Sequence, residues 1–544
     1  MTNKLVSSRR HFISGSAAFL SAPAIARAAG TSVAPYIGPV ATGCALADAC
    51  TATTSPTIQN SYAQNVCVAT VTSTVANAVS SLSRTPCVMM DAPSTIQIVV
   101  PTWYVGVPQG SNSCVATNEI SQPGSTAIAV AIEWANGAPL APVTFQGGRQ
   151  IPVSQGGGVS FVSDPVPNQA SIGQRFWVWI AQVNENGIIY RTRTPGLGDS
   201  PNGEAWLYNF TPDVLNSIVT NNGLSGLSYA NFSSYGTLLN GLYNPCTFRP
   251  AAILGLTTKP TVALIGDSRA AGLGDNYLDG AGFIGNMERS IGPHFAYLQL
   301  SRVGESATNF DASGTKRMQL AGMCSHVIEN LGGNDILAGY AFDPTLTLYK
   351  RILWNQFGKP LNRIFSMTID PVTNSSDLWT TTQNQTPETF ASQCTQYNSF
   401  IRGLSNGITP IDTAGTVEPS WSGTEDFRWS NSSYTVTAFT QSTSGTEAVA
   451  NLASAAGLSV GCCVKVSAFG GGTGVYAIDA INGGSVQLYL SNFAGQNWSG
   501  GGTLNASLCA SHPNYGLADG IHANPIGYRR IAQSGVIPSG LFQF

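Results

Sequence analysis

Alternating apolar and polar residues mark short β-strands in the first half of the chain. From Pro142 the sequence reads VTFQGGRQIPVSQGGGVSFVSDPV and then RFWVWIAQV, with Gly, Pro and Asn between the runs. Strand-like runs also occur at Thr95–Val100 and Ala127–Glu133. A period of two that is interrupted by turn residues predicts antiparallel strands. The number and shortness of these strands predict an N-terminal all-β sandwich.

Near Lys259 the pattern changes to continuous apolar strands separated by helix-like stretches. TVALIGDS, FAYLQLSRVG, HVIENLGGND, RIFSMTIDP and GITPIDTAG each carry one such strand. Apolar strands that alternate with helices predict a parallel sheet with both faces covered. The expected fold class is therefore α/β in this part of the chain.

The α/β pattern is interrupted between about Asn431 and Leu508. YTVTAFT, VGCCVKVSAF, GVYAIDAI and SVQLYLS read as hairpin strands, with a helix-like piece at Glu447–Ala456. A final loop and helix follow in ADGIHANPIGYRRIAQSG. The predicted division is an export signal, a β-rich region with the sandwich, a first part of the α/β core, a β-rich insertion and a second part of the core, at residues 1–28, 29–250, 251–430, 431–510 and 511–544.

The N-terminus has the anatomy of a removable export signal. A basic segment precedes a short apolar stretch from Phe12 to Ile25, and small residues flank Arg27. This pattern predicts cleavage after Ala28 and a periplasmic or secreted protein. The Arg9-Arg10 pair in SRRHFI resembles the bacterial twin-arginine signal. An ordinary signal that happens to contain two arginines is the alternative. No later run reaches 18 apolar residues, so we expect no transmembrane segment after signal removal.

Composition narrows the class of partner. Of 544 residues 43% are hydrophobic and 10% are charged, and the formal net charge is −3. That hydrophobic content excludes wholesale disorder, and the lack of a basic stripe argues against a nucleic-acid partner. The eleven cysteines are too few for a disulfide scaffold. Cys44 with Cys50, and Cys67 with Cys87, are candidate local pairs.

Four short polar signals follow one another along the α/β part. Three of them follow predicted strands, at Thr261–Ile265, Phe295–Leu300 and His326–Asn330, and the fourth opens the last helix. Loops at the carboxyl ends of parallel strands lie on one edge of the sheet, where such folds bind ligands. The four signals are Gly266-Asp267-Ser268, Gly304, Gly332-Gly333-Asn334-Asp335 and Asp519-Gly520-Ile521-His522.

These residue types are those that nucleophilic catalysis by serine requires. Ser268 needs a base to take its proton, and His522 is the candidate. Asp519, three residues earlier, would hold the imidazole in the right tautomer and stabilise its charged form. Donors fixed in advance must stabilise the oxyanion. The backbone N–H groups of Ser268 and Gly304 and the amide of Asn334 are the candidates.

The ordered blocks GDS, Gly, GxND and DxxH resemble the SGNH (GDSL-type) hydrolase superfamily over roughly residues 258–430 and 515–540. The resemblance implies a three-layer α/β/α, flavodoxin-like fold and ester hydrolysis through an acyl-serine. By position it matches Ser268 to the nucleophile, Asp519 and His522 to the rest of the triad, and Gly304 and Asn334 to oxyanion donors. Arg269 stands where the GDSL consensus has leucine, and VGES replaces a glycine pair. Asp267 and Asp335 are expected to brace loops.

Other signals are weaker. Gly403–Gly407 and Gly457–Gly461 match G-x-S-x-G, but neither lies between a strand and a helix, so both are expected to be turns. Arg269, Asp377 and Trp379 are candidates for the lining of the substrate cleft. No metal or organic cofactor is expected, because Cys462, Cys463, Cys509 and His512 lack paired metal-ligand spacing. The glycine run Gly470–Gly472 is expected to be a hairpin turn.

The sequence thus predicts an exported carboxylic ester hydrolase. The preferred substrate is a short acyl ester, such as an O-acetyl group, on a carbohydrate, and that preference rests on analogy with the family. An acylated polysaccharide is accordingly the expected partner. The alternatives are a lipase or lysophospholipase, a polysaccharide O-acetyltransferase, and a non-catalytic glycan-binding protein.

Overall fold

The computed structural model describes most of the chain from residue 53 onward. Among the residues predicted to have a function, Asp519 and His512 lie outside the described part, as do the export signal, Cys44, Cys50, Cys67 and Gly470–Gly472. The described ranges are 53–56, 61–62, 80–106, 118–121, 126–138, 140–148, 151–153, 158–183, 199–208, 248–277, 279–419, 426–441, 447–460, 462–468, 473–489, 499–509, 520–537 and residue 540.

Two antiparallel sheets lie in the N-terminal region. One runs in the order β1 (Thr53–Pro56), β14 (Ala252–Thr257), β4 (Thr95–Pro101), β10 (Ser160–Val162), with β11 (Val166–Pro167) also paired to β4. The other runs in the order β13 (Ala205–Tyr208), β3 (Ser80–Val88), β12 (Arg175–Val183), β7 (Thr126–Trp134), β8 (Ala141–Val143), with β9 (Ile151–Val153) paired to β7. A third, two-stranded sheet joins β5 (Trp103–Gly106) to β6 (Asn118–Ser121).

The two larger sheets share one apolar core. Ile98 of β4, Ile132 of β7 and Phe176 of β12 belong to the same buried cluster. The strands predicted at Thr95–Val100 and Ala127–Glu133 are therefore present as β4 and β7. In contrast, the predicted Cys67–Cys87 pair is wrong. Cys87 lies in β3 as a fully buried free thiol, because its position faces the core between the sheets.

The centre of the α/β part is a six-stranded, wholly parallel sheet. Its order is β2 (Ser61–Tyr62), β16 (Ala296–Gln299), β15 (Thr261–Ile265), β17 (His326–Glu329), β18 (Ile364–Met367), β21 (Thr409–Ile411). From β15 onward the strands lie in the order 2-1-3-4-5, so the strand order reverses between β15 and β17. Ligands bind at such a reversal in doubly wound sheets. The mixed α/β character and the parallel sheet predicted from the sequence are confirmed.

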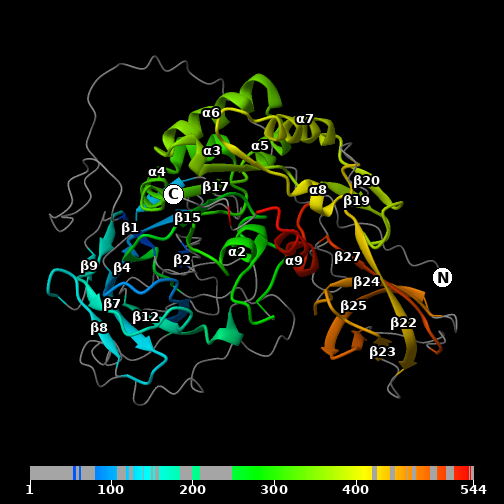
Figure 1. The fold of residues 1–544 in the computed structure, drawn as a ribbon, viewed down its shortest axis with the longest axis horizontal. Helices are drawn as coiled ribbons and strands as arrows, with labels where there is room; N and C mark the ends of the chain where they lie inside the picture. Colours follow the sequence, from blue (N-terminus) through cyan, green and yellow to red (C-terminus); the bar gives the residue numbers. More distant parts are fainter. Residues whose placement is uncertain are drawn as a thin grey trace. The chain divides into compact units, whose positions relative to one another are not determined.

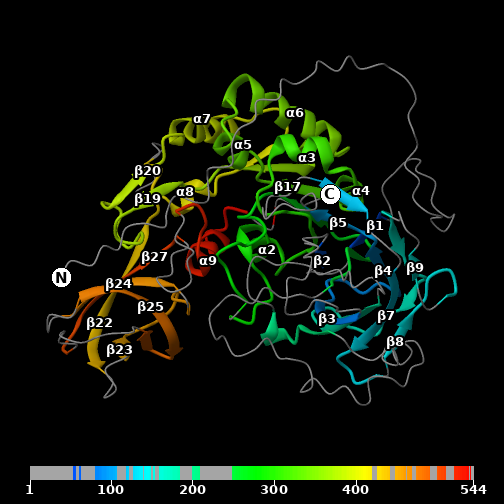
Figure 2. The same cartoon turned by 180° about the vertical axis from the view of Figure 1, so that it is seen from behind.

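Residues on the two faces of this sheet belong to different apolar clusters. Ala263 and Val327 pack with side chains of α3, α4, α6 and α7, whereas Leu264 and Ile328 pack with side chains of α2. The last helix, α9, packs against α2 (Figures 1 and 2). The helix bounds are α2 Gly285–Ile291, α3 Ala307–Ser313, α4 Thr315–Gly322, α5 Gly333–Leu337, α6 Thr347–Gln356, α7 Ala391–Arg402, α8 Ala414–Val417 and α9 Pro525–Gln533.

Shorter elements complete the α/β part. The strands β19 (Thr373–Ser375) and β20 (Gln385–Pro387) form a hairpin after β18. Single helical turns of 3-10 or π type occur at Ser200–Asn202, Phe342–Leu346 and Leu361–Arg363. Among the described residues, no helix is long and apolar enough to cross a bilayer.

The predicted β-rich insertion contains a closed antiparallel barrel, coloured yellow to red in Figure 1. Around the barrel the strands are β22 (Asn431–Gln441), β23 (Glu447–Leu452), β26 (Ser485–Tyr489), β25 (Thr473–Asn482), β24 (Cys463–Ala468) and β27 (Gly502–Ser507). The helix expected at Glu447–Ala456 is wrong. Its first six residues form β23, whose backbone pairs with β22 on one side and β26 on the other. Tertiary pairing overrides the helix propensity of this alanine-rich segment.

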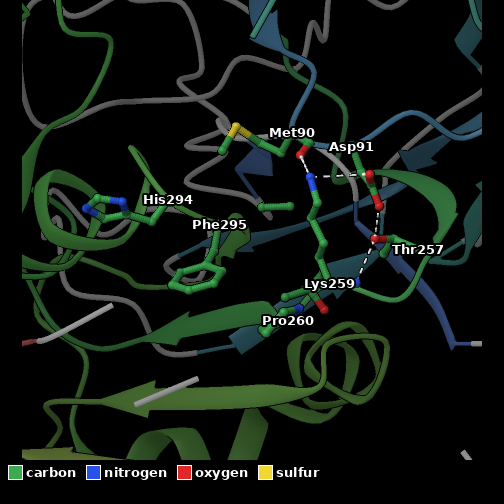
Figure 3. A pocket seen from close by; sticks show the side chains of 9 residues that line it. Met90, Asp91, Thr257, Lys259, Pro260, His294 and Phe295 are labelled. Atoms are coloured by element: carbon green, nitrogen blue, oxygen red, sulfur yellow. Dashed lines mark hydrogen bonds and ion pairs between the residues drawn. The ribbon is translucent and has the colours of Figure 1, made fainter. Parts of the chain in front are cut away.

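A polar contact links the segment between β3 and β4 to the start of the parallel sheet (Figure 3). Lys259, between β14 and β15, donates through Nζ to the Met90 carbonyl at 3.0 Å and pairs with Asp91 at 3.3 Å. The Thr257 hydroxyl donates to the same carboxylate. These residues and His294 line a cavity of about 10 Å³, the lower limit for one water molecule. The cavity is lined by none of the predicted site residues.

Candidate active site

Ser268 and His522 meet at the carboxyl edge of the parallel sheet. Ser268 lies in the turn that follows β15, and His522 lies in the loop before α9. The Ser268 Oγ and His522 Nε2 atoms are 2.6 Å apart, although the residues are 254 positions apart in sequence. Each residue is 7% exposed. This is the contact that a serine nucleophile and its base require, with most of the surrounding water excluded.

The turn that carries Ser268 is held by its own backbone and by Asn330. The Leu273 N–H donates to the Ser268 carbonyl at 2.8 Å, and the Ala271 N–H donates to Asp267 at 3.0 Å. The Asn330 Oδ1 accepts from the Asp267 N–H at 3.0 Å, and its Nδ2 donates back to the Asp267 carboxylate at 3.2 Å. Asp267 thus braces the loop, as the sequence predicts, and links the loops after β15 and β17.

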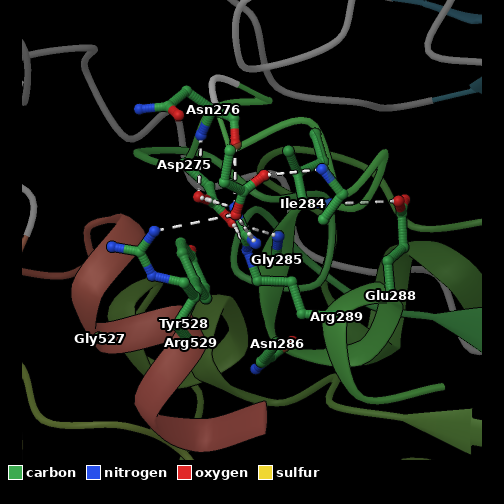
Figure 4. Close-up of polar contacts among 12 residues, drawn as sticks. Asp275, Asn276, Ile284, Gly285, Asn286, Glu288, Arg289, Gly527, Tyr528 and Arg529 are labelled. Carbon is green, nitrogen blue, oxygen red and sulfur yellow. Dashed lines mark hydrogen bonds and ion pairs between the residues drawn. The ribbon is translucent and has the colours of Figure 1, made fainter. Parts of the chain in front are cut away.

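A second anchor joins the end of this turn to α2 and α9 (Figure 4). Asp275 accepts from the Gly285 N–H at 2.8 Å and from Arg289 Nε at 2.6 Å and Nη2 at 2.9 Å. From α9, the Tyr528 hydroxyl donates to the Leu273 carbonyl at 2.9 Å. The helix that follows His522 is therefore bonded directly to the turn that begins at Ser268.

The loop that carries His522 is fixed on both sides. The Gly520 carbonyl accepts from the Thr373 N–H at 3.1 Å and from Trp429 Nε1 at 3.0 Å. A Cβ on Gly520 would lie 1.7 Å from the Thr373 carbonyl oxygen, and its φ of +67° is strained for other residues. After His522, Asn524 caps α9 and donates to the Ser507 carbonyl at the end of β27, at 2.7 Å. The barrel and the β19–β20 hairpin therefore both hold this loop.

The predicted oxyanion donors also lie in loops at this edge. Gly304 follows β16 with a φ of +76°, a conformation that favours glycine. The Asn334 Nδ2 donates to the Glu305 carbonyl at 2.8 Å, which fixes the amide and leaves its second hydrogen for another acceptor. Within the described residues, neither the Ser268 nor the Gly304 backbone N–H has a hydrogen-bond acceptor. Donors of this kind are those that an oxyanion needs.

Asp335 has a bracing role. Its carboxylate accepts from the Ala307 N–H at 2.7 Å and the Thr308 N–H at 3.0 Å, and so caps α3. Burial raises the pKa of Asp335, although these hydrogen bonds oppose the shift. Because α3 begins shortly after Gly304, this contact ties the loop of Gly304 to the loop of Asn334.

One supporting contact escaped the sequence analysis. Glu119 of β6 accepts from the Lys316 and Arg317 N–H groups at 2.6 and 3.0 Å, and so caps α4. The Arg317 side chain pairs with Glu119 at 3.2 Å and with Glu305, the residue after Gly304, at 2.5 Å. The N-terminal region thereby supports the loop of Gly304. Since Glu119 and Arg317 are 198 positions apart, no local pattern could have revealed the contact.

The three predicted cleft residues occupy different surroundings. The Arg269 side chain is 4% exposed and turns inward to Asp267, so little of it can meet a substrate. Trp379 is 2% exposed and donates to the Thr373 hydroxyl at 2.9 Å. Asp377 accepts from Thr381 at 2.6 Å and Asn384 at 3.0 Å. Burial raises the pKa of Asp377, but these hydrogen bonds outweigh it and hold the pKa below its usual value.

The remaining signals lie in structural positions. The segment Gly403–Gly407 is a turn between α7 and β21, and the described residues 457–460 of the second match lie between β23 and β24, so neither forms a strand–turn–helix elbow. Cys462 and Cys509 are buried in the core of the barrel. In the described part of the chain, no three His, Cys, Asp or Glu side chains are grouped so that they could hold a metal.

Comparison with known proteins assigns no family. No family model matches the sequence, and no curated protein matches it. Among solved structures, a lipase from a goat rumen metagenome matches with 12% identity and a TM-score of 0.22, covering 30% of this chain and 84% of its own.

Two larger structures match to a similar degree. A salicylyl-acyltransferase from a tetracycline biosynthetic pathway matches with 10% identity and a TM-score of 0.23, covering 62% of this chain and 70% of its own. A family two carbohydrate esterase from Cellvibrio japonicus matches with 10% identity and a TM-score of 0.20, covering 66% and 87%. Such scores establish neither a common fold nor a common function.

Proposed function

We propose that this protein is an exported serine esterase of the SGNH type, with a three-layer α/β/α core. The observation that carries the proposal is the 2.6 Å contact between Ser268 Oγ and His522 Nε2 at the carboxyl edge of the sheet. The backbone N–H of Ser268 and the loops of Gly304 and Asn334 lie at the same edge. A nucleophile, a base and an oxyanion site together provide what acyl transfer needs.

The reaction follows from the roles of these groups. His522 Nε2 takes the Ser268 proton as Oγ attacks the ester carbonyl, and the N–H donors of Ser268, Gly304 and Asn334 stabilise the resulting oxyanion. The C–O bond to the alcohol then breaks, and His522 returns the proton to that alcohol. His522 then takes a proton from water, which attacks the acyl-serine. The bond between the acyl carbon and Ser268 Oγ breaks, the proton on His522 returns to Oγ, and the acid is released. Asp519, outside the described residues, is the proposed partner of the other imidazole nitrogen.

The decisive test uses two serine variants. Purified wild-type protein, Ser268→Ala and Ser405→Ala are treated with a fluorophosphonate probe and assayed on p-nitrophenyl acetate. Ser405 is the matched control, because it occupies the exposed G-x-S-x-G turn away from any strand–helix elbow. We expect Ser268→Ala to lose labelling and about 10³-fold or more of kcat, with Ser405→Ala unchanged. Folded wild-type protein that is inert in both assays would refute the proposal.

The proposed substrate is a short acyl ester on a carbohydrate. The low charge of the chain and its large β-rich parts favour a neutral, polymeric partner. The test is acetate release from an acetylated polysaccharide, beside p-nitrophenyl esters of increasing chain length. Higher kcat/KM on long-chain esters would favour a lipase instead, and acyl transfer to an added sugar would identify a transferase.

Export is the second part of the proposal. The basic, apolar and small-residue segments of the first 28 residues support it. Sequencing the N-terminus of the protein recovered from the periplasm or medium should show a chain that starts at Ala29. An intact Met1 on cytoplasmic protein would contradict export.

A further inference from the structure

Arg269, the residue after Ser268, touches three of the loops that form the proposed site. Its Nε donates to the carbonyl of Ile521, the neighbour of His522, at 3.2 Å. Its Nη1 lies 3.5 Å from the Asp267 carboxylate. A Cβ added to Gly333 would lie 2.9 Å from the same Nη1, so the guanidinium packs directly against the loop of Asn334. One side chain thus lies between the nucleophile turn, the histidine loop and the oxyanion loop.

The fourth loop at this edge contributes a buried carboxylate, Asp370, after β18. Asp370 is 1% exposed, and among the described residues neither of its oxygens has a hydrogen-bond partner within bonding distance, although the Thr413 hydroxyl is near enough to lower its pKa. The Nη2 of Arg269 likewise has none. The charges of Asp267 and Asp370 raise the pKa of Arg269 against the lowering effect of burial, so the three groups interact electrostatically. Burial of a carboxylate without a close hydrogen-bond donor lowers the stability of the fold, so a role in the site would explain why Asp370 is there.

We propose that Arg269 is a positioning residue that sets the distance between Ser268 and His522, and that Asp370 is the buried counter-charge that holds its guanidinium in place. The inference rests on the proposed esterase function. Arg269 can act in this way because its planar group reaches Ile521 and Asp267 at the same time, which a lysine cannot do. A small displacement of reacting groups is enough to cost a large factor in rate.

The arrangement also makes the site sensitive to pH. Burial raises the pKa of Asp370 to about 6, although Arg269 and the Thr413 hydroxyl lower it. The other charged groups that act on Asp370 are the carboxylates of Asp267 and Asp412, and Arg402 pairs with Asp412 at 2.7 Å. Below about pH 6 Asp370 takes up a proton and Arg269 loses part of its counter-charge. We therefore expect a loss of activity as the pH falls through this range.

The first experiment replaces the arginine. Arg269→Leu and Arg269→Lys are compared with Arg351→Leu, which removes an exposed arginine from α6. Both Arg269 variants should lose about 10²-fold in kcat and in the rate of fluorophosphonate labelling, with KM changed by less than about threefold. Arg351→Leu should match the wild type. A kcat within about twofold of wild type in Arg269→Lys would overturn the positioning role.

The second experiment separates positioning from folding. In Asp370→Asn the buried charge is removed, so we expect an equal or higher melting temperature at pH 7.5 together with a kcat about tenfold lower. A purely structural role predicts that stability and activity fall together. The acid limb of log kcat/KM against pH should also become less steep near pH 6 in Asp370→Asn than in the wild type, because one titrating group is removed. Unchanged kcat, or a lower melting temperature, would overturn the inference.

The two proposals fail in different ways. If the wild type is neither labelled nor active, the esterase proposal fails. If the wild type is labelled at Ser268 and the Arg269 and Asp370 variants behave like it, the esterase proposal stands and only the positioning role is refuted.

Discussion

Two clusters of buried charge lie beside the parallel sheet, one around Glu329 and Lys350 and the other around Arg269 and Asp370. Glu329 ends β17 and accepts from Lys350 Nζ, from the Ser366 hydroxyl, from Trp354 Nε1 at 3.0 Å and from the Leu331 N–H at 3.1 Å. Lys350 Nζ also donates to the Leu331 carbonyl at 2.9 Å. Each polar atom of this pair is therefore matched.

The polar atoms of the Arg269 and Asp370 cluster, at the carboxyl edge of the sheet, are not all matched in this way. Arg269 approaches Asp267 only to 3.5 Å, and among the described residues Asp370 has no donor within bonding distance, with only the more distant Thr413 hydroxyl acting on it. Full matching of polar groups is what a stable interior requires, whereas incomplete matching costs stability. The Lys350 cluster therefore stabilises the fold, whereas the Arg269 cluster costs stability at a place where it orders the proposed site. The two clusters should therefore respond to substitution in opposite ways.

The largest predicted effect on stability belongs to the Lys350 cluster. Lys350→Met leaves the Glu329 charge buried and unpaired, so the free energy of unfolding should fall by about 3–5 kcal/mol in a urea titration. The activity per folded molecule should stay near that of the wild type. Because this variant can fail to fold, the double variant Lys350→Met with Glu329→Gln is measured beside it. The double variant carries no unpaired charge and should recover much of the loss. If it were as unstable as the single variant, the charge account would be wrong.

The next largest effect is expected at the proposed oxyanion site, where a substitution should lower activity and leave stability nearly unchanged. Asn334→Ala removes one oxyanion donor, so kcat on p-nitrophenyl acetate should fall by about 10²–10³-fold. The residue is half-buried, and among the described residues its side chain makes one hydrogen bond, to the Glu305 carbonyl. The free energy of unfolding should therefore change by no more than about 1 kcal/mol. Asn355→Ala, on the exposed side of α6, is the control and should leave kcat unaltered. A parallel fall in stability and kcat for Asn334→Ala would remove the contrast between the Lys350 cluster and the proposed oxyanion site.

The smallest effect is expected at a charged pair that is exposed to solvent. The Lys259 side chain is 48% exposed and pairs with Asp91 at 3.3 Å. Lys259→Met should change the free energy of unfolding by less than about 1 kcal/mol, and the change should shrink further at high salt. A loss as large as that of Lys350→Met would show that burial does not determine how much an ion pair matters here.

The sequence located the candidate site residues where each of them directly follows a predicted strand. The strand Thr261–Ile265 and the residues that follow it could be located because apolar strands of a parallel sheet end at a common edge. The contact between Ser268 and His522 follows from that topology. The inward turn of Arg269 could not be anticipated, because it depends on three other loops.

The sequence did not predict three features that depend on pairing between distant segments of the chain. The two residues of β2 are too short to show a pattern, although they complete the parallel sheet beside β16. Closure of the barrel depends on β22 pairing with both β23 and β27, which no single hairpin signal reveals. The contacts of Glu119 with α4 join parts of the chain that have no relation in sequence. Hydrophobic periodicity predicts which residues of a segment are buried, but it does not predict which distant segment packs against them.

The most direct test of the central claim is to trap the covalent intermediate. The wild-type protein is mixed with excess p-nitrophenyl acetate, quenched in acid within the first turnovers, digested and mapped by mass spectrometry. The account predicts an acetyl group on the side chain of Ser268, absent from Ser268→Ala. It also predicts more of that adduct in a His522→Ala protein acylated by a more reactive ester, because deacylation lacks its base. Turnover with the acetyl group on another residue, or unaltered turnover by Ser268→Ala, would contradict the account.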